Sequence, residues 1–431
     1  MKIFTSKDRS FRAAVARIAS RSNFRMESVE PAVKAILKGV ERGGDQAVIR
    51  YTKKFDRIVL KPEQLRVSSQ QVKEAYDHVR TDEIDALRYA AQRIMAFHKR
   101  QRSKTWMYHE GGATLGQMVL PLDAVGLYVP GGKAVYPSSV LMSAIPAKVA
   151  GVKRVVMCTP TPMGSISPYL LVAADIAGVD EVYRIGGVQA IAAMAYGTQT
   201  IARVDKIVGP GNIFVATAKR LMYGTVGIDM VAGPSELVVI ADEAADPSHV
   251  AADLLCEAEH DEDAKVYLVT TSAHVAQEVS RCLADQVKRL GRENITMKSI
   301  ARHTVAFVVE SLHDAIELAN TIAPEHLALS IDRPFDYVEH IRHAGALFLG
   351  RYTPPAVADY VAGPNHVLPT ARSARFSSGL GVMDFMKRTS FLRCDPRSLA
   401  RLGPAAIALG RAEGLEAHAR SIAIRLEAAP Q

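Results

Sequence analysis

The sequence predicts an α/β fold built from two lobes. From Leu120 onward, short runs of β-branched residues alternate with alanine-rich helical runs at a spacing of a few tens of residues. A second block repeats this alternation with similar spacing, which suggests two related lobes. The chain has 431 residues, a length typical of two or three domains.

The segment before the alternation is predicted to be mostly helical. Few strong turn signals occur in residues 1–107, and helical patterns cover Val33–Val40 and Asp82–Ile94. The glycine pair Gly43–Gly44 is expected to break the helical pattern that precedes it.

The first block contains four predicted strands, and each is followed by a turn rich in glycine or proline. The strands are Ala124–Val129, Arg154–Cys158, Glu181–Ile185 and Lys206–Val208, and the helices are Ser138–Val149, Pro168–Ala177, Val188–Tyr196 and Ile213–Leu221. Such turns lie at the carboxyl ends of parallel strands, where they can present backbone N–H groups to an anionic cofactor. The glycine- and proline-rich turns are explained equally well as tight connections between strands and helices, without any ligand. Because no Gly-x-Gly-x-x-Gly or P-loop motif is present, kinase and ATPase functions are excluded.

The second block repeats the pattern and leads into a helical end. Its strands are Leu237–Ala241, Lys265–Thr270, Thr304–Val309 and Ala346–Phe348, and its helices are Asp246–Glu259, Val275–Leu290 and Asp314–Asn320. Asp246 and Pro247 have the residue types of an N-cap and a first helical position. The last predicted helical segment runs from about Ser398 to Leu426.

The charge is unevenly distributed, because residues 1–107 hold 24 Lys and Arg against 12 Asp and Glu, and the rest hold 29 against 33. These basic residues follow amphipathic helical patterns without interleaved aromatic residues, which favours a solvated helical face over a nucleic-acid surface.

The first residues do not form a secretory signal, and no apolar run approaches the ~20 residues that span a bilayer. Four scattered cysteines fit a reducing compartment. We therefore expect a cytoplasmic protein that binds neither nucleic acid nor membrane.

Two pairs of an acidic residue and a histidine are candidates for chemistry. Glu257 and His260 are three residues apart at the end of a predicted helix, where they could bind one metal ion or form a solvated helix end. Glu325 stands directly beside His326, a carboxylate and an imidazole suited to general-base chemistry or to an ordinary exposed loop.

Two further segments carry groups of the same kind. A loop dense in glycine and proline offers Asp359, Asn365 and His366, and loops of this composition often carry function. Glu413 and His418 lie on a predicted helix near the end of the chain, where a solvated face is the default interpretation.

Taken together, these segments resemble the histidinol dehydrogenase family, whose members catalyse the last two oxidations of histidine biosynthesis. The match covers almost the whole chain in the family's order. The matching stretches are Gly43–Ala47, Tyr51–Asp56, Val125–Gly132, Ile207–Asn212, Ala232–Glu236, Ala258–His260, Pro324–His326, Gly363–Thr370, Phe376–Leu380 and Ala412–His418.

The resemblance implies a zinc- and NAD-dependent enzyme that converts L-histidinol to L-histidine through the aldehyde. The implied ligands of one Zn²⁺ per subunit are Glu257, His260, Asp359 and His418, a set of oxygen and nitrogen donors that suits this ion. The implied substrate contacts are Ser235, Glu413, His326 and His366 together with the metal ligands. NAD is expected over Tyr128, Gln189 and Asn212. His326 would take the hydroxyl proton in the first oxidation, and Glu325 would activate water for the second.

The resemblance also implies a domain organisation and a homodimer. It implies two Rossmann-like doubly wound lobes, one formed by residues 24–127 with 235–380 and one, the NAD-binding lobe, by residues 128–234. A helical N-terminal arm covers residues 1–23. A helical tail, residues 381–431, would cross to the partner subunit and complete the partner's site with Glu413 and His418.

One position departs from the family pattern, because Glu257 stands where the family usually has glutamine. A second carboxylate beside Asp359 would formally neutralise Zn²⁺ and is expected to tighten metal binding. It also leaves open a related dehydrogenase that acts on another alcohol. A non-catalytic nucleic-acid or scaffold protein, suggested by the basic residues 1–107, is the remaining alternative.

Overall fold

The computed structural model describes residues 1–21, 26–131 and 135–427. The chain divides into two compact units, one formed by residues 1–101 and 122–385 and the other by residues 102–121 and 386–431. Gly132 of the matching stretch and the predicted boundary between residues 23 and 24 lie outside the described residues. The first unit contains two parallel sheets with helices on their faces, which confirms the predicted α/β class.

The first sheet of this unit, here called the N-lobe sheet, has five parallel strands in the order β6-β5-β4-β7-β8. Its strands are β4 (Ala124–Tyr128), β5 (Arg154–Cys158), β6 (Glu181–Tyr183), β7 (Lys206–Val208) and β8 (Gly227–Ile228). The helices between them are α5 (Pro137–Ala150), α6 (Pro168–Ala177), α7 (Gly187–Tyr196) and α8 (Ile213–Met222). The four predicted strands are confirmed; the two-residue β8 is too short for its pattern to be recognised.

The helical segment near the start of the chain covers this same sheet. It forms α2 (Glu30–Asp56), α3 (Ser69–Ala75) and α4 (Thr81–Lys99), and α2 contains non-helical φ and ψ angles at Gly44, where the glycine pair predicted a break. The apolar side of α2 shares a core with α7 and α8, while α4 packs on α5 and α3 on α6. This packing differs from the predicted assignment of residues 24–127 to the lobe of residues 235–380. An amphipathic stripe shows that a helix face is buried but not which sheet buries it.

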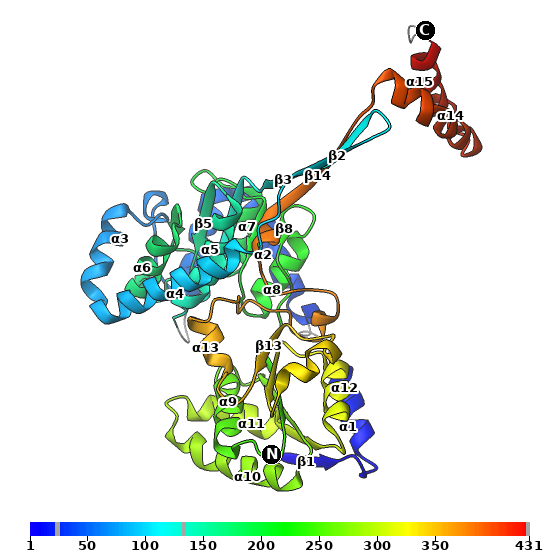
Figure 1. Ribbon diagram of the computed structural model, residues 1–431. Helices are drawn as coiled ribbons and strands as arrows, with labels where there is room; N and C mark the ends of the chain where they lie inside the picture. The colour runs from blue at the N-terminus through cyan, green and yellow to red at the C-terminus, as the bar shows by residue number, and fades with distance from the viewer. Residues whose placement is uncertain (22–25, 132–134, 428–431) are drawn as a thin grey trace. The chain divides into compact units, whose positions relative to one another are not determined.

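The second sheet, here called the C-lobe sheet, has six parallel strands in the order β1-β11-β10-β9-β12-β13. Its strands are β1 (Lys2–Thr5), β9 (Glu236–Ala241), β10 (Lys265–Thr270), β11 (Val305–Val308), β12 (His326–Ser330) and β13 (Ala346–Leu349). Two cores lie on opposite faces, because alternate residues of β9 belong to each. Helices α1 (Phe11–Ala19) and α12 (Leu312–Ile322) cover one face, and α9 (Pro247–Ala258), α10 (Ala273–Gln286) and α11 (Glu293–His303) cover the other (Figure 1).

Two strands of this sheet were not predicted from the sequence. Residues 1–23, expected as a helical arm, contain α1 but also β1, which pairs with β11 at the edge of the sheet. The sequence left an ordinary exposed loop open for Glu325 and His326, whereas β12 begins at His326 and lies between β9 and β13. His326 is therefore fixed at the amino end of a central strand.

The second unit consists of a three-stranded antiparallel sheet and two helices. The strands β2 (Trp106–Glu110), β3 (Ala113–Pro121) and β14 (Met386–Arg393) are ordered β14-β3-β2. The helices α14 (Pro396–Ala412) and α15 (Glu416–Glu427) follow β14 and pack side by side (Figure 1). Helices α14 and α15 agree with the predicted helical tail of residues 381–431. Strand β14 lies within the same residues and was not predicted, and neither were β2 and β3. Every residue of β2 is exposed, so the alternation that marks a half-buried strand is missing there.

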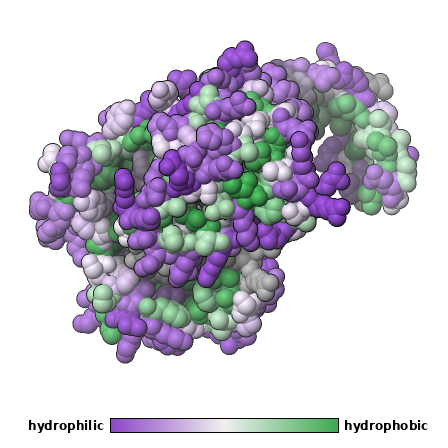
Figure 2. All heavy atoms as spheres, turned by 90° about the horizontal axis from the view of Figure 1, so that it is seen from below, coloured by the Kyte–Doolittle hydropathy of each residue, from purple (hydrophilic) through white to green (hydrophobic). Residues whose placement is uncertain are grey.

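Large apolar side chains are exposed on this second unit. They are Trp106, Met107, Tyr108, Met118, Leu120, Leu392, Leu402, Leu409, Leu415 and Ile424. Figure 2 shows hydrophobic surface at the right, where α14 and α15 lie. Exposed apolar side chains that gather on one part of a protein are typical of interaction sites. None of the described helices is long and apolar enough to cross a membrane.

Candidate active site

A cavity of about 600 Å³ lies in the first unit, between elements of both sheets. On one side are turns that follow β4 and β7 of the N-lobe sheet, represented by Gly131 and Gly211. On the other side are Ser235, just before β9, and His326, the first residue of β12. The cavity therefore faces the carboxyl ends of the N-lobe strands but the amino ends of the C-lobe strands.

The direction of α9 brings Glu257 to this cavity. Asp246 caps the helix, since its side chain accepts a hydrogen bond from the Ser248 N–H at 2.7 Å, as the sequence predicted. A helix that follows a strand in a parallel sheet runs back antiparallel to it, so the end of α9 lies near the amino ends of β9 and β12. The helix ends at Ala258, one residue before its predicted end at Glu259, and His260 follows in a turn.

Glu257, Glu325 and His326 form one buried cluster at this edge. Nδ1 of His326 lies 3.2 Å from Oε2 of Glu257 and 3.9 Å from Oε2 of Glu325. It also lies 3.2 Å from the carbonyl oxygen of Glu236. These acceptors favour the tautomer with the proton on Nδ1. Nε2 of the same ring is buried without a protein hydrogen-bond partner, so its lone pair is available to a ligand.

The pKa values of this cluster respond to burial and to charge. Burial raises the pKa of the Glu325 carboxyl, and the neighbouring Glu257 raises it further against the opposing effect of His326. Burial alone would lower the pKa of His326, but Glu257, Glu325 and Asp359 together raise it. Perturbed groups of this kind are typical of active sites.

The negative charge of the cavity lining indicates that the cavity can bind a cation. Five carboxylates line it, and the described lining residues include no Lys or Arg; the carboxylates belong to Glu257, Asp261, Asp263, Glu325 and Asp359. Burial raises the pKa of Asp359 and the neighbouring Glu257 raises it further, while His326 and His260 oppose the shift. Within the described ranges, Glu257, Glu325 and His326 also place ligand atoms within 4.8 Å of one another, a spacing that a metal ion can bridge. The donor set therefore fits a divalent ion.

The structure brings together most, but not all, of the predicted metal ligands. Glu257, His260 and Asp359 line the same cavity. His260 and Asp359 nevertheless lie outside the close cluster of ligand atoms. Glu413 and His418 belong to the second unit, where Glu413 ends α14 and His418 lies in the first turn of α15.

His366 is held as a neutral ring at the wall of the cavity. Its Nδ1 lies 2.9 Å from the carbonyl oxygen of Asp359, which requires the proton on that nitrogen. Its Nε2 lies 3.2 Å from Oγ of Ser139. Burial lowers the pKa of His366 to about 4, and the neighbouring His326 and His260 shift it in the same direction. The partner Ser139 was missed by sequence reasoning, because a serine in the first turn of a helix carries no functional signal.

The opposite wall has the properties expected of a nucleotide site. The first turns of α5 and α8 reach the cavity through Ser138 and Ile213. Helix N-termini favour anions, so this wall suits a pyrophosphate. The predicted residues Tyr128 and Asn212 line the cavity, and Asn212 caps α8 by accepting from two backbone N–H groups.

Gln189, the third predicted cofactor residue, lies behind this wall. Both polar atoms of its side-chain amide are buried without a protein partner. Burying an unpaired amide is costly, which indicates that a ligand or water pairs with it. Gln189 follows Gly187, whose N–H donates to the hydroxyl oxygen of Tyr128 at 3.1 Å. The structure thus connects Tyr128 and Gln189 through one short turn, but Gln189 is not among the residues that line the cavity.

A buried ion pair shapes the turn after β7. Lys219 of α8 and Asp229 are in direct contact, and both side chains are almost fully buried. Lys219 donates to the carbonyl oxygen of Gly209 at 2.8 Å, and Asp229 accepts from the Gly209 N–H at 2.8 Å. Gly209 adopts a φ of 111°, and a Cβ there would lie 2.1 Å from the carbonyl oxygen of Tyr128. Only glycine lets this turn approach β4 so closely.

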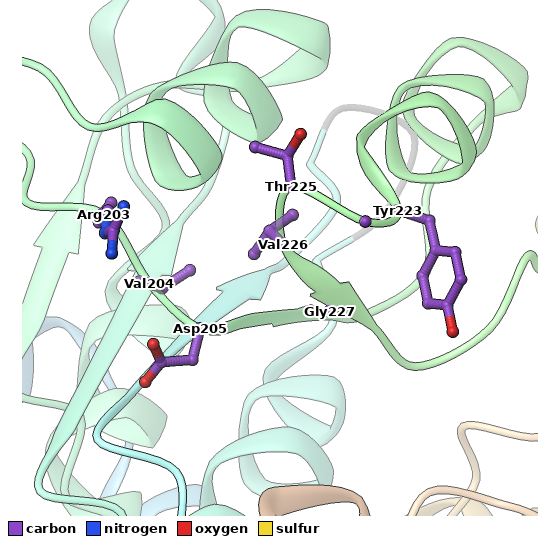
Figure 3. Close-up of a pocket in the computed structure, with 8 residues that line it drawn as sticks. Arg203, Val204, Asp205, Tyr223, Thr225, Val226 and Gly227 are labelled. Atoms are coloured by element: carbon purple, nitrogen blue, oxygen red, sulfur yellow. The ribbon is translucent and has the colours of Figure 1, made fainter. Parts of the chain in front are cut away.

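A smaller hollow of about 400 Å³ lies at the other end of the N-lobe sheet, around the amino ends of β7 and β8. The side chains of Arg203, Asp205 and Tyr223 do not converge there on one point (Figure 3). Asp205 instead accepts hydrogen bonds from the backbone N–H groups of Asp123 and Ala124. This hollow has a structural explanation and lacks convergent chemistry.

Comparisons with known proteins show which family the chain is similar to. The model of the histidinol dehydrogenase family matches residues 19–426. A histidinol dehydrogenase from Gluconobacter oxydans is 53% identical over 95% of both chains, and one from Rhodopseudomonas palustris is 53% identical over 98% of this chain and 97% of its own. The crystal structure of histidinol dehydrogenase from Elizabethkingia anophelis is 35% identical, with a TM-score of 0.94 over 99% of this chain and 98% of its own.

Proposed function

The chain belongs to the histidinol dehydrogenase family, and we propose that it oxidises L-histidinol to L-histidine with NAD⁺ as the electron acceptor. The observation that carries this proposal is the cavity itself. One wall is rich in carboxylates and imidazoles, which suit a metal ion and a substrate that bears an ammonium and an imidazole group. The other wall presents two helix N-termini, which suit a dinucleotide.

We propose that Glu257, His260, Asp359 and His418 hold one Zn²⁺. When bound, zinc supplies a fixed template for the imidazole and amine of the substrate and polarises the oxygen that reacts. Ser235, His366 and Glu413 complete the substrate contacts in this proposal. The neutral His366 can exchange hydrogen bonds with the polar groups of the substrate without repelling its ammonium.

NAD is proposed to bind over Tyr128, Gln189 and Asn212. The unpaired amide of Gln189 is the observation that favours this location. When bound, NAD⁺ supplies the acceptor for hydride. Because an alcohol loses four electrons on its way to a carboxylate, one site must use NAD⁺ twice.

The proton chemistry is assigned to His326 and Glu325. The unpaired Nε2 of His326 can accept the hydroxyl proton of the alcohol, while its Nδ1–H remains bound to the surrounding acceptors. The raised pKa of Glu325 brings its carboxyl toward the range in which it can take a proton from water that adds to the aldehyde. His326 then accepts the proton of the hydrate in the second oxidation.

The test of this function is the yield of NADH per substrate molecule. Purified, zinc-loaded protein is mixed with limiting L-histidinol and excess NAD⁺, and absorbance gives the NADH formed. We expect two NADH per histidinol, with loss of turnover on chelation and recovery on addition of zinc. No NADH from metal-loaded protein would contradict the proposal and favour a related dehydrogenase of another alcohol.

The Glu257→Gln variant is expected to bind zinc more weakly than the natural chain. Glutamine keeps an oxygen donor of the same length but removes one of the two carboxylate charges that would neutralise the ion. Competition with a chromogenic chelator at fixed pH measures the change in zinc affinity directly. Equal or tighter zinc binding by Glu257→Gln would exclude Glu257 as a charged ligand.

A homodimer in which the tail of one subunit completes the site of the other is part of this proposal. Glu413 and His418 lie in the second unit, while the cavity lies in the first. The exposed apolar side chains of the second unit favour burial against a partner. Such an arrangement makes an isolated subunit inactive.

A further inference from the structure

Glu236, the first residue of β9, contacts both proposed catalytic residues through its backbone. Its N–H donates to Oε2 of Glu325 at 3.0 Å, and its carbonyl oxygen lies 3.2 Å from Nδ1 of His326. The parallel pairing of β12 with β9 sets His326 opposite Leu237. The position of this one peptide segment therefore fixes the orientation of the carboxylate and of the imidazole.

Arg21 holds the side chain of Glu236 in a buried bidentate pair. Nε and Nη2 of Arg21 donate to Oε1 and Oε2 of Glu236, each at 2.5 Å. The two side chains are 6% and 0% exposed. Paired N–H···O bonds of this type fix direction as well as distance. The N-terminal segment thus fixes the start of β9.

The same guanidinium also contacts the segment that leads into the catalytic pair. Nη1 of Arg21 donates to the carbonyl oxygen of Ile322 at 2.8 Å, and Nη2 lies 3.5 Å from that of Ala323. Ala323 ends α12 with a φ of 49°, and only Pro324 separates it from Glu325. Arg21 therefore joins the two chain segments that determine where Glu325 and His326 lie.

Charge neutralisation alone does not require an arginine at this place. Nζ of Lys265 lies 3.6 Å from Oε1 of Glu236 and already supplies a cation. A lysine cannot donate to both carboxylate oxygens and to a carbonyl of α12 in one fixed plane, whereas a guanidinium can.

We propose that Arg21 is a positioning residue for the Glu325–His326 pair, acting through Glu236 and the end of α12. This inference rests on the proposed function for its kinetic consequences. The predicted effect of Arg21 on the orientation of His326 does not depend on that function, because the Nδ1–H···O bond from His326 to Glu236 exists without substrate. A misplacement of reacting groups by about 1 Å can cost about 10²-fold in rate.

The experiment compares zinc-loaded Arg21→Met and Arg21→Lys with the natural enzyme. We expect Arg21→Met to lower kcat by about 10²-fold, and Arg21→Lys by about tenfold, with KM for L-histidinol changed less than kcat in both. The Nδ1–H proton signal of His326 is followed by NMR with ¹⁵N-labelled histidine and assigned by its loss in His326→Asn. It should shift and exchange faster with solvent in both Arg21 variants.

Two control variants separate positioning from loss of stability or charge. Lys265→Met removes the other cation beside Glu236 but leaves the contacts of Arg21 intact. Arg351→Met breaks the pair with Asp242, just beyond the opposite end of β9. Both controls should keep kcat and the His326 signal near those of the natural enzyme, whatever their thermal midpoints.

The outcomes distinguish this inference from the proposed function. A natural enzyme that does not oxidise histidinol refutes the function, while a changed His326 signal in the Arg21 variants still supports positioning. If Arg21→Met fails to fold, Arg21→Lys decides, because it keeps the charge. An unchanged kcat and an unchanged His326 signal in Arg21→Lys would overturn the inference, as would an equal effect in Lys265→Met.

Discussion

The Glu325→Gln variant is expected to oxidise L-histidinol to the aldehyde at a rate close to that of the natural enzyme but to lose the second oxidation. General acid–base groups contribute about 10² to 10⁴-fold to a step, so a loss of that size is expected in the hydration and oxidation of the aldehyde. The first step needs only a base for the hydroxyl proton, which is the role proposed for Nε2 of His326. The amide cannot take a proton from water.

Glutamine suits this test because it keeps the local structure. Oε2 of Glu325 accepts a hydrogen bond from the Glu236 N–H, and an amide oxygen can accept the same bond. Separate assays with L-histidinol and with the aldehyde give the two half-reactions. His326→Asn is the matched comparison and should slow both. Equal losses of both half-reactions in Glu325→Gln would refute the division of roles.

The core of the fold could be predicted because its strands are buried on both faces. After a charged first residue, strands β5 and β9 are short apolar runs, and the sequence identified both. The edge strand β1 and the exposed ribbon strand β2 lack that signal. Which of the two sheets α2 covers depends on tertiary packing, which local periodicity does not encode.

Only part of the candidate site could be predicted from local sequence patterns. The cavity lies at the carboxyl ends of the N-lobe strands but at the amino ends of the C-lobe strands. The turns after the parallel strands of the N-lobe sheet drew attention to Tyr128 and Asn212, and both residues line the cavity. The same rule gives no reason to expect chemistry at the amino end of β12, where His326 lies. The adjacent Glu325 and His326 were a candidate pair from the residues alone, and the resemblance supplied their roles. The return direction of α9 explains physically why Glu257 meets His326.

Arg21 and Glu236 were not singled out because neither has a distinctive neighbour in sequence. They are 215 residues apart, and only the parallel pairing of the C-lobe sheet and the docking of α1 bring them together. A buried ion pair of this kind can be recognised only after the topology is known. It is costly unless fully hydrogen-bonded, and here every oxygen of the carboxylate has a guanidinium donor.

The second large effect is expected from His418→Ala, which should lose activity and bind zinc more weakly. A ligand removed from a four-ligand set leaves the ion with one fewer bond and an altered geometry. In the proposed dimer the missing ligand affects the partner's cavity rather than the cavity of the same subunit. Activity and zinc content of the purified variant measure the loss. Full zinc affinity in His418→Ala would exclude His418 as a ligand.

Mixing two inactive variants tests which subunit supplies the ligand. In a dimer of one His326→Asn subunit and one His418→Ala subunit, a crossing tail gives one cavity with both histidines intact and one with neither. Random assortment from equal amounts should therefore restore about a quarter of the natural activity. If each tail served its own subunit, every cavity would lack one histidine and no activity would return. His418→Ala mixed with itself after the same unfolding and reassembly gives the background, so any recovery above it requires exchange of the tail between subunits.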